Sequence, residues 1–268
     1  MTHMNDYAKA DEYSSLEMMA ICGSRTIRDG ETVFAGTGLP VLAAMLAQKT
    51  HAPRSKIVYE GGFIDSRNIH LPLSVADSRL TYRAAAAIGL RETLGILLQG
   101  GRIDVGFLGA AQIDQYGNVN TTIIGDFDRP KIRLPGSGGG NDIASSSKRI
   151  VIIMTHDKRK FVKRLDYMTS PGYLDGPGGR EKVGLRGGGP SSVVTNLCVL
   201  NFEEKAKKMK LLSVHSSVTV QQVIENTGFD LLLPETVLET NAPTYEELRI
   251  VREIDPTGIY LGKREKKQ

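Results

Sequence analysis

The sequence has 268 residues, of which 40% are hydrophobic and 24% are charged, close to the average soluble globular protein. The formal net charge is +4, but residues 262–268 hold four basic side chains against one acidic side chain, so the rest is nearly balanced and gives no reason to expect nucleic-acid binding. No apolar run reaches the roughly 18 residues of a membrane span, and the N-terminus lacks a signal-peptide core, so we expect a cytoplasmic protein without a membrane partner.

The first 160 residues alternate short apolar runs with longer helical patterns, which is typical of a mostly parallel sheet covered by helices. The periodicity predicts helices at residues 14–28, 41–48, 80–88 and 91–99. It predicts strands at residues 32–35, 56–60, 103–110 and 149–155.

The second half has a different pattern. Two strand-like runs at 192–202 and 209–214 flank the charged segment 203–208, which predicts an antiparallel hairpin. Helices are predicted at 219–226 and 244–253.

These elements predict an α/β fold, with a mostly parallel sheet flanked by helices and an antiparallel hairpin extension in the C-terminal half. We expect a single domain over residues 1–268, with flexible ends at 1–13 and 262–268. The long loop at 170–180 is rich in glycine and proline, and loops of this length are often functional.

The sequence gives no sign of a metal site. Cys22 and Cys198 lie in apolar patterns without metal-ligand spacing, so both are predicted to be buried small side chains. Four histidines lack an i, i+4 partner and a nearby acidic pattern, so no zinc site is expected at His51, His70, His156 or His215.

Three glycine-rich loops each fit a strand-to-helix junction, at 36–40, 60–62 and 136–142. In an open α/β sheet such loops gather at the carboxyl ends of the strands, where ligands bind. None matches the dinucleotide or nucleoside-triphosphate fingerprints, and the nucleophile elbow of the α/β-hydrolases is absent.

One of these loops carries a carboxylate. Glu60 ends the apolar run at 56–60 and is followed by Gly61 and Gly62, so backbone can approach it closely. Such a carboxylate can be a nucleophile, or it can be a solvated residue at the end of a strand.

The motifs resemble those of family I coenzyme A-transferases, and their order and spacing resemble the β subunit. The quoted segments are Gly36-Thr37-Gly38-Leu39-Pro40, Tyr59-Glu60-Gly61-Gly62, residues 109–120 (GAAQIDQYGNVN) and Gly136-Ser137-Gly138-Gly139. The segments 169–181 and 225–230 are similar to the glutaconate CoA-transferase branch, and the similarity extends from about residue 17 to 259.

The resemblance implies a catalytic role for Glu60. It would attack an acyl-CoA thioester to give a mixed anhydride, and returning CoA thiolate would form a glutamyl-CoA thioester that the acceptor acid resolves. The resemblance places the oxyanion hole at Gly138 and Gly139, and the CoA-binding loop at Gly36, Thr37, Gly38, Leu39 and Pro40. Lys158 or Lys160 is a weaker candidate for the CoA phosphates.

The resemblance also implies how the chain works with other molecules. CoA and acyl-CoA are expected as substrates, with no permanently bound cofactor. An α subunit would supply a matching domain and much of the acid-binding pocket, so we expect a hetero-oligomer.

Two alternatives stay open. The chain can be a relative that decarboxylates a CoA thioester or opens a ring by hydrolysis, although the glutamate is replaced in such relatives and Glu60 is present here. It can also be a non-catalytic ligand-binding or assembly subunit. The sequence does not identify the carboxylic acid.

Overall fold

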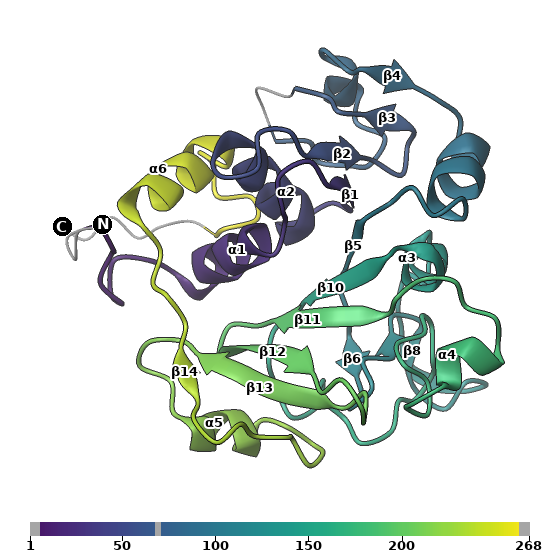
Figure 1. The fold of residues 1–268 in the computed structure, drawn as a ribbon, viewed down its shortest axis with the longest axis vertical. Coiled ribbons are helices and arrows are strands. Elements are labelled where there is room, and N and C mark those ends of the chain that lie inside the picture. The colour runs from purple at the N-terminus through teal and green to yellow at the C-terminus, as the bar shows by residue number, and fades with distance from the viewer. Residues whose placement is uncertain (1–5, 68–70, 263–268) are drawn as a thin grey trace.

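The computed structural model describes residues 6–67 and 71–262. Ten strands form one sheet in the order β14-β13-β12-β11-β10-β5-β1-β2-β3-β4 (Figure 1). The strands of its centre run parallel, and their bounds are β1 Thr32–Phe34, β2 Lys56–Val58, β5 Val105–Leu108, β10 Arg149–Ile153 and β11 Pro190–Val194. This confirms the predicted parallel core.

Alternate residues of the central strands enter different apolar clusters. Val33 and Ile57 point into one cluster, and Phe34 and Val58 point into the other, so the sheet is buried on both faces. The first cluster includes the helices α1 Ser15–Arg25, α2 Leu39–Lys49 and α6 Tyr245–Ile254, which pack together (Figure 1).

Capping residues mark where these helices begin. Ser14 and Glu17 form a reciprocal capping box at α1, and Thr244 and Glu247 form another at α6. Ala8 donates a backbone hydrogen bond to the Pro243 carbonyl, so this part of the N-terminal segment lies beside the start of α6.

The antiparallel extension in the C-terminal half is also confirmed. β12 Cys198–Phe202 pairs antiparallel with β11 and with β13 Met209–Val214, the second pair joined by the charged segment 203–208 as predicted. β14 Leu238–Glu239 adds to β13, and the short helices α4 Gly179–Lys182 and α5 Val220–Glu225 complete this half.

Two element predictions are wrong. The run at 192–202 is not one strand, because the Thr195 hydroxyl accepts hydrogen bonds from the amides of Leu197 and Cys198 and turns the chain between β11 and β12. The segment 80–88 is not a helix. It contains the end of a 3-10 turn, Ser78–Thr81, and the edge strand β4 Ala86–Ala87, because pairing with β3 Phe63–Ile64 outweighs the helical preference of its alanines.

The predicted helix at 91–99 is a π-helix, Glu92–Leu98. Among the elements that were not predicted, two short strand pairs and one helix lie around the pocket described below: β6 Gln112–Ile113 with β7 Val119–Asn120, β8 Ile123–Gly125 with β9 Pro130–Arg133, and α3 Gly140–Ser146. Within residues 6–67 and 71–262, no helix has the length and apolar character needed to cross a bilayer.

Candidate active site

Glu60 lies just beyond the carboxyl end of β2, in a turn that only glycine can complete. A Cβ atom on Gly61 would lie 2.3 Å from the Val75 carbonyl oxygen, and one on Gly62 would lie 1.9 Å from that of Ile88. Gly62 also has φ +93°, in the left-handed region. The two glycines therefore let neighbouring backbone pack tightly under the carboxylate.

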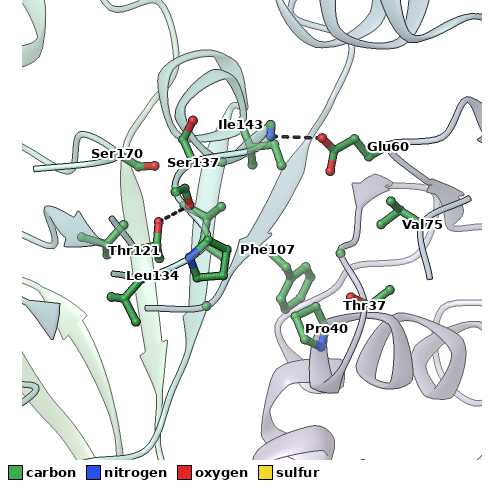
Figure 2. A pocket seen from close by; sticks show the side chains of 18 of the residues that line it. Thr37, Pro40, Glu60, Val75, Phe107, Thr121, Leu134, Ser137, Ile143 and Ser170 are labelled. Atoms are coloured by element: carbon green, nitrogen blue, oxygen red, sulfur yellow. Dashed lines mark hydrogen bonds between the residues drawn. The ribbon is translucent and has the colours of Figure 1, made fainter. Parts of the chain in front are cut away.

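The Glu60 carboxylate contacts the glycine-rich loop at 136–142. The Gly139 amide donates a hydrogen bond to Oε1 at 3.0 Å (Figure 2). A Cβ atom on Gly139 would lie 3.0 Å from Oε1 and 3.2 Å from Cδ, so a side chain there would push the carboxylate away. Two segments 79 residues apart thus form one site.

Thr121 holds the glycine loop in place. Its hydroxyl donates to the Gly136 carbonyl at 2.8 Å, and the Gly136 amide donates to the Thr121 carbonyl at 2.8 Å. Gly136 and Gly138 have φ values of +93° and +47°, which favour glycine. The loop then turns into α3, where the Gly140 amide donates to the Ser137 carbonyl.

The carboxylate opens into a pocket of about 500 Å³. Figure 2 shows Glu60, Val75, Phe107 and Pro40 on one side of it, and Ser170, Ser137, Thr121 and Leu134 on the other. The remaining lining residues are Gly36, Thr37, Leu108, Gly109, Ala111, Val119, Pro135, Gly136, Gly139, Gly140 and Ile143.

The structure brings together some of the predicted site residues. Of the loop predicted to bind CoA, three residues line the pocket and Gly38 and Leu39 do not. Gly138 does not line it either, although its neighbour Gly139 does. Lys158 is exposed beyond β10 and is not a lining residue, while Lys160 bonds the Thr155 hydroxyl.

A buried polar cluster behind the pocket was not predicted from the sequence. The Thr169 hydroxyl accepts from the Thr121 amide at 2.9 Å and contacts the Thr122 hydroxyl at 2.7 Å, and the Thr169 carbonyl accepts from Asn141 at 2.9 Å. Asn120, fully buried, binds Gln112 across the β6–β7 pair. The sequence pointed to this region only because segment 109–120 resembles a motif of the family.

Arg180 is a second residue that the sequence did not indicate. Its buried guanidinium donates to the carbonyls of Gly172, Ala144 and Gly187 at 2.8, 3.0 and 2.9 Å. Burial lowers its pKa, because desolvation disfavours the charged form. Arg180 therefore ties the loop at 170–180 to the end of α3.

The remaining titratable candidates are structural. His156 stacks on Phe161 with ring centroids 3.8 Å apart, and burial lowers its pKa to about 4. Cys22 and Cys198 are buried as predicted, and burial raises the pKa of each thiol to about 12. In the described part of the chain, which excludes His70, no three His, Cys, Asp or Glu side chains group to hold a metal ion.

Comparison with known proteins decides the family. Residues 16–226 match the sequence profile of the family described as coenzyme A transferase. The chain belongs to the coenzyme A transferase family. It is 44% identical to the β subunit of 3-oxoadipate CoA-transferase from Pseudomonas knackmussii, over 91% of this chain and 94% of that protein.

Other family members match over nearly their whole length. The chain is 42% identical to the β subunit of glutaconate CoA-transferase from Acidaminococcus fermentans, over 96% of this chain and 97% of that protein. It superimposes on the crystal structure of glutaconate coenzyme A-transferase from the same organism with a TM-score of 0.89 and 39% identity, covering 97% and 100% of the two chains. The predicted resemblance to a CoA-transferase β subunit is therefore confirmed.

Proposed function

We propose that the chain is the catalytic β subunit of a hetero-oligomeric CoA-transferase, in which Glu60 is the covalent nucleophile. One observation supports this most strongly. The Glu60 carboxylate opens into the pocket at the carboxyl ends of the parallel strands, and the Gly139 amide lies 3.0 Å from its Oε1 atom. The partner in this proposal is an α subunit, and the reaction takes place in the cytoplasm without a permanently bound cofactor.

The reaction conserves an activated acyl group at every step. A Glu60 oxygen attacks the thioester carbon, the C–S bond breaks, and CoA thiolate leaves an acyl-glutamyl anhydride. The thiolate then attacks the Glu60 carbonyl carbon, which releases the donor acid and leaves a glutamyl-CoA thioester. The acceptor carboxylate reverses these two steps, so the products are a new acyl-CoA and a free Glu60 carboxylate.

Gly139 has two tasks in this scheme. In the free protein its amide holds Oε1, which leaves the other carboxylate oxygen for attack. When the tetrahedral intermediate forms, the amides of Gly139 and Gly138 stabilise the oxyanion. Losing one such donor typically raises the activation barrier by about 2.7–4 kcal/mol.

We further propose that the acid is a dicarboxylic acid of five or six carbons. The two relatives named above are a glutaconate and a 3-oxoadipate CoA-transferase subunit, and both acids have two carboxylates. The 36–40 loop contacts CoA in this proposal, and Lys158 reaches a CoA phosphate outside the pocket. A decarboxylase, a ring-opening hydrolase and a non-catalytic subunit are not favoured, because relatives at 42–44% identity are CoA-transferase subunits.

The test uses the chain co-purified with its α subunit. Glutaconyl-CoA is added, the adduct is trapped with hydroxylamine or borohydride, and mass spectrometry locates the modified residue. We expect a CoA-dependent modification at Glu60, no transfer by Glu60→Ala, and full transfer by Glu235→Ala, which removes an exposed glutamate elsewhere. Transfer that survives Glu60→Ala would overturn the mechanism, and an active isolated monomer would overturn the hetero-oligomer.

A further inference from the structure

The pocket contains a serine whose hydroxyl makes no hydrogen bond within the described part of the chain. Ser170 is 2% exposed and lines the pocket. Its backbone pairs with Val119 at 3.0 and 3.1 Å, but within the described residues its hydroxyl has no hydrogen-bond partner. Thr121 differs, because its hydroxyl donates to Gly136. Since the residue is otherwise buried, its hydroxyl is open only toward the pocket, where a ligand group can complete its hydrogen bond.

The Ser170 hydroxyl is held in a fixed place. The preceding residue, Thr169, is anchored through its side chain and its carbonyl, and the Gly172 carbonyl accepts from Arg180. A Cβ atom on Gly140 would lie 3.5 Å from Ser170 Oγ, so the hydroxyl faces the backbone of Gly140. A polar group with such support loses little entropy when a ligand binds.

Figure 2 places Ser170 and Glu60 on opposite sides of the pocket, with the glycine loop between them. A ligand group that reaches the Ser170 hydroxyl therefore lies some bonds away from the carbon that Glu60 attacks. The group is part of the substrate, but it is not the reacting centre.

The charge of the pocket restricts what that group is. Among the described lining residues, Glu60 is the one charged side chain, and the others are apolar, hydroxyl-bearing or glycine. A second carboxylate in this pocket would meet Glu60 without a cation to balance it, so repulsion and desolvation both oppose it. The distal carboxylate of a dicarboxylic acid is thus a poor occupant. The pantetheine arm of CoA is a good one, because it is uncharged and carries amides on an apolar chain.

We propose that the Ser170 hydroxyl hydrogen-bonds an amide of the pantetheine arm while the thioester lies at Glu60. This rests on the proposed CoA-transferase function. It divides the substrate in two: the pocket of this chain takes the neutral arm, and the distal carboxylate of the acid lies outside it.

The test compares the two half-reactions of the complex between the chain and its α subunit. Ser170→Ala is expected to lower kcat/KM for glutaconyl-CoA by roughly 2- to 12-fold, the range of one neutral hydrogen bond. Calorimetry should show the Kd of free CoA rising by a similar factor. The kcat/KM for the acceptor acid should stay unchanged, because CoA is already attached to Glu60 in that half-reaction.

Ser55→Ala is the matched control. Ser55 is also fully buried, but its hydroxyl donates to the Ala52 carbonyl and it lies outside the pocket. We expect it to leave the Kd of CoA unchanged.

Two results would overturn the proposal: an unchanged Kd of CoA in Ser170→Ala, or a loss in kcat/KM that falls on the acid. If wild-type protein forms no Glu60 adduct, the proposed function fails, and the CoA titration still decides the role of Ser170.

Discussion

The two walls of the pocket are built by different means. The wall with Glu60 depends on backbone, since Gly62 lets a neighbouring carbonyl approach where any side chain would collide. The wall with Ser170 depends on buried side chains, since the Thr169 hydroxyl accepts from the Thr121 amide and Arg180 donates to backbone carbonyls of several segments. The first wall is therefore disrupted when a side-chain atom is added to a glycine, and the second is disrupted when a hydrogen bond of a buried side chain is removed.

The largest effect is expected where the two walls meet. Gly139→Ala adds a Cβ atom 3.0 Å from Glu60 Oε1 while keeping an ordinary φ of −75°, so the fold should survive and the carboxylate should move. We expect kcat to fall about 10²–10³-fold, as for the loss of an oxyanion donor. Steady-state kinetics measure this, with Gly95→Ala as control because nothing lies within 4 Å of a Cβ atom there. An unchanged kcat would separate Gly139 from the chemistry.

A pair of glycine variants tests the backbone wall. Gly62→Ala combines left-handed strain with a collision against the Ile88 carbonyl, and we expect unfolding to become easier by about 3 kcal/mol or more. Gly30→Ala has a similar φ of +87° with nothing within 4 Å, so it should cost about 1–2 kcal/mol. Urea unfolding measures both. Equal losses would show that the close approach does not matter.

Acid sensitivity tests the half of the molecule that carries buried polar groups. Burial lowers the pKa of His156 from 6.5 to about 4, so the neutral ring stabilises the fold above pH 6.5, and this contribution is lost as the pH falls toward 4. Between pH 7 and pH 5 the loss should be about 2 kcal/mol, and His156→Gln should remove it. Part of the slope should remain, because burial also lowers the pKa of His215.

Urea unfolding at the two pH values measures the slope, and hydrogen exchange locates it. Exchange at pH 5 should rise first in residues 156–161 and 195–198, which surround His156. If amide exchange at pH 5 instead rose first in residues 56–64, which hold Glu60 and its glycines, acid sensitivity would not be confined to the half with buried polar side chains.

The smallest effect tests one hydrogen bond of the second wall. Thr169→Val keeps the shape of the side chain but leaves the Thr121 amide without its acceptor, so stability should fall by about 1 kcal/mol. Turnover should fall slightly, because Thr121 holds the Gly136 carbonyl. Thr236→Val, at an exposed position, is the control in the same denaturation and rate measurements.

The same contrast explains what the sequence predicted. The parallel strands follow apolar runs, α1 and α6 begin with capping boxes, and α2 begins with Pro40 in its first turn, so the local pattern was enough. The close approach of backbone to Glu60 could be predicted because Gly61 and Gly62 are visible in the sequence itself.

The parts that were missed depend on distant partners. Residues 80–88 are rich in alanine and look helical, yet β3 recruits Ala86–Ala87 as an edge strand. Nothing local marks Arg180 as buried, because its acceptors come from two loops and from helix α3. The sequence likewise did not single out Ser170, because only the folded structure shows that its hydroxyl lines the pocket without a partner among the described residues.

The hydrogen bond between Gly139 and Glu60 links the resting carboxylate to the proposed oxyanion site. In the proposed mechanism the amide that stabilises the oxyanion is the amide that occupies Oε1 before substrate arrives. A substrate must therefore replace Oε1 as the hydrogen-bond acceptor of the Gly139 amide. A thioester does this only when its carbonyl oxygen reaches that amide. A small electrophile that cannot make this exchange still meets the free oxygen of Glu60, but its tetrahedral intermediate gains no hydrogen bond from Gly139. The arrangement therefore disfavours acylation of Glu60 by the wrong compound.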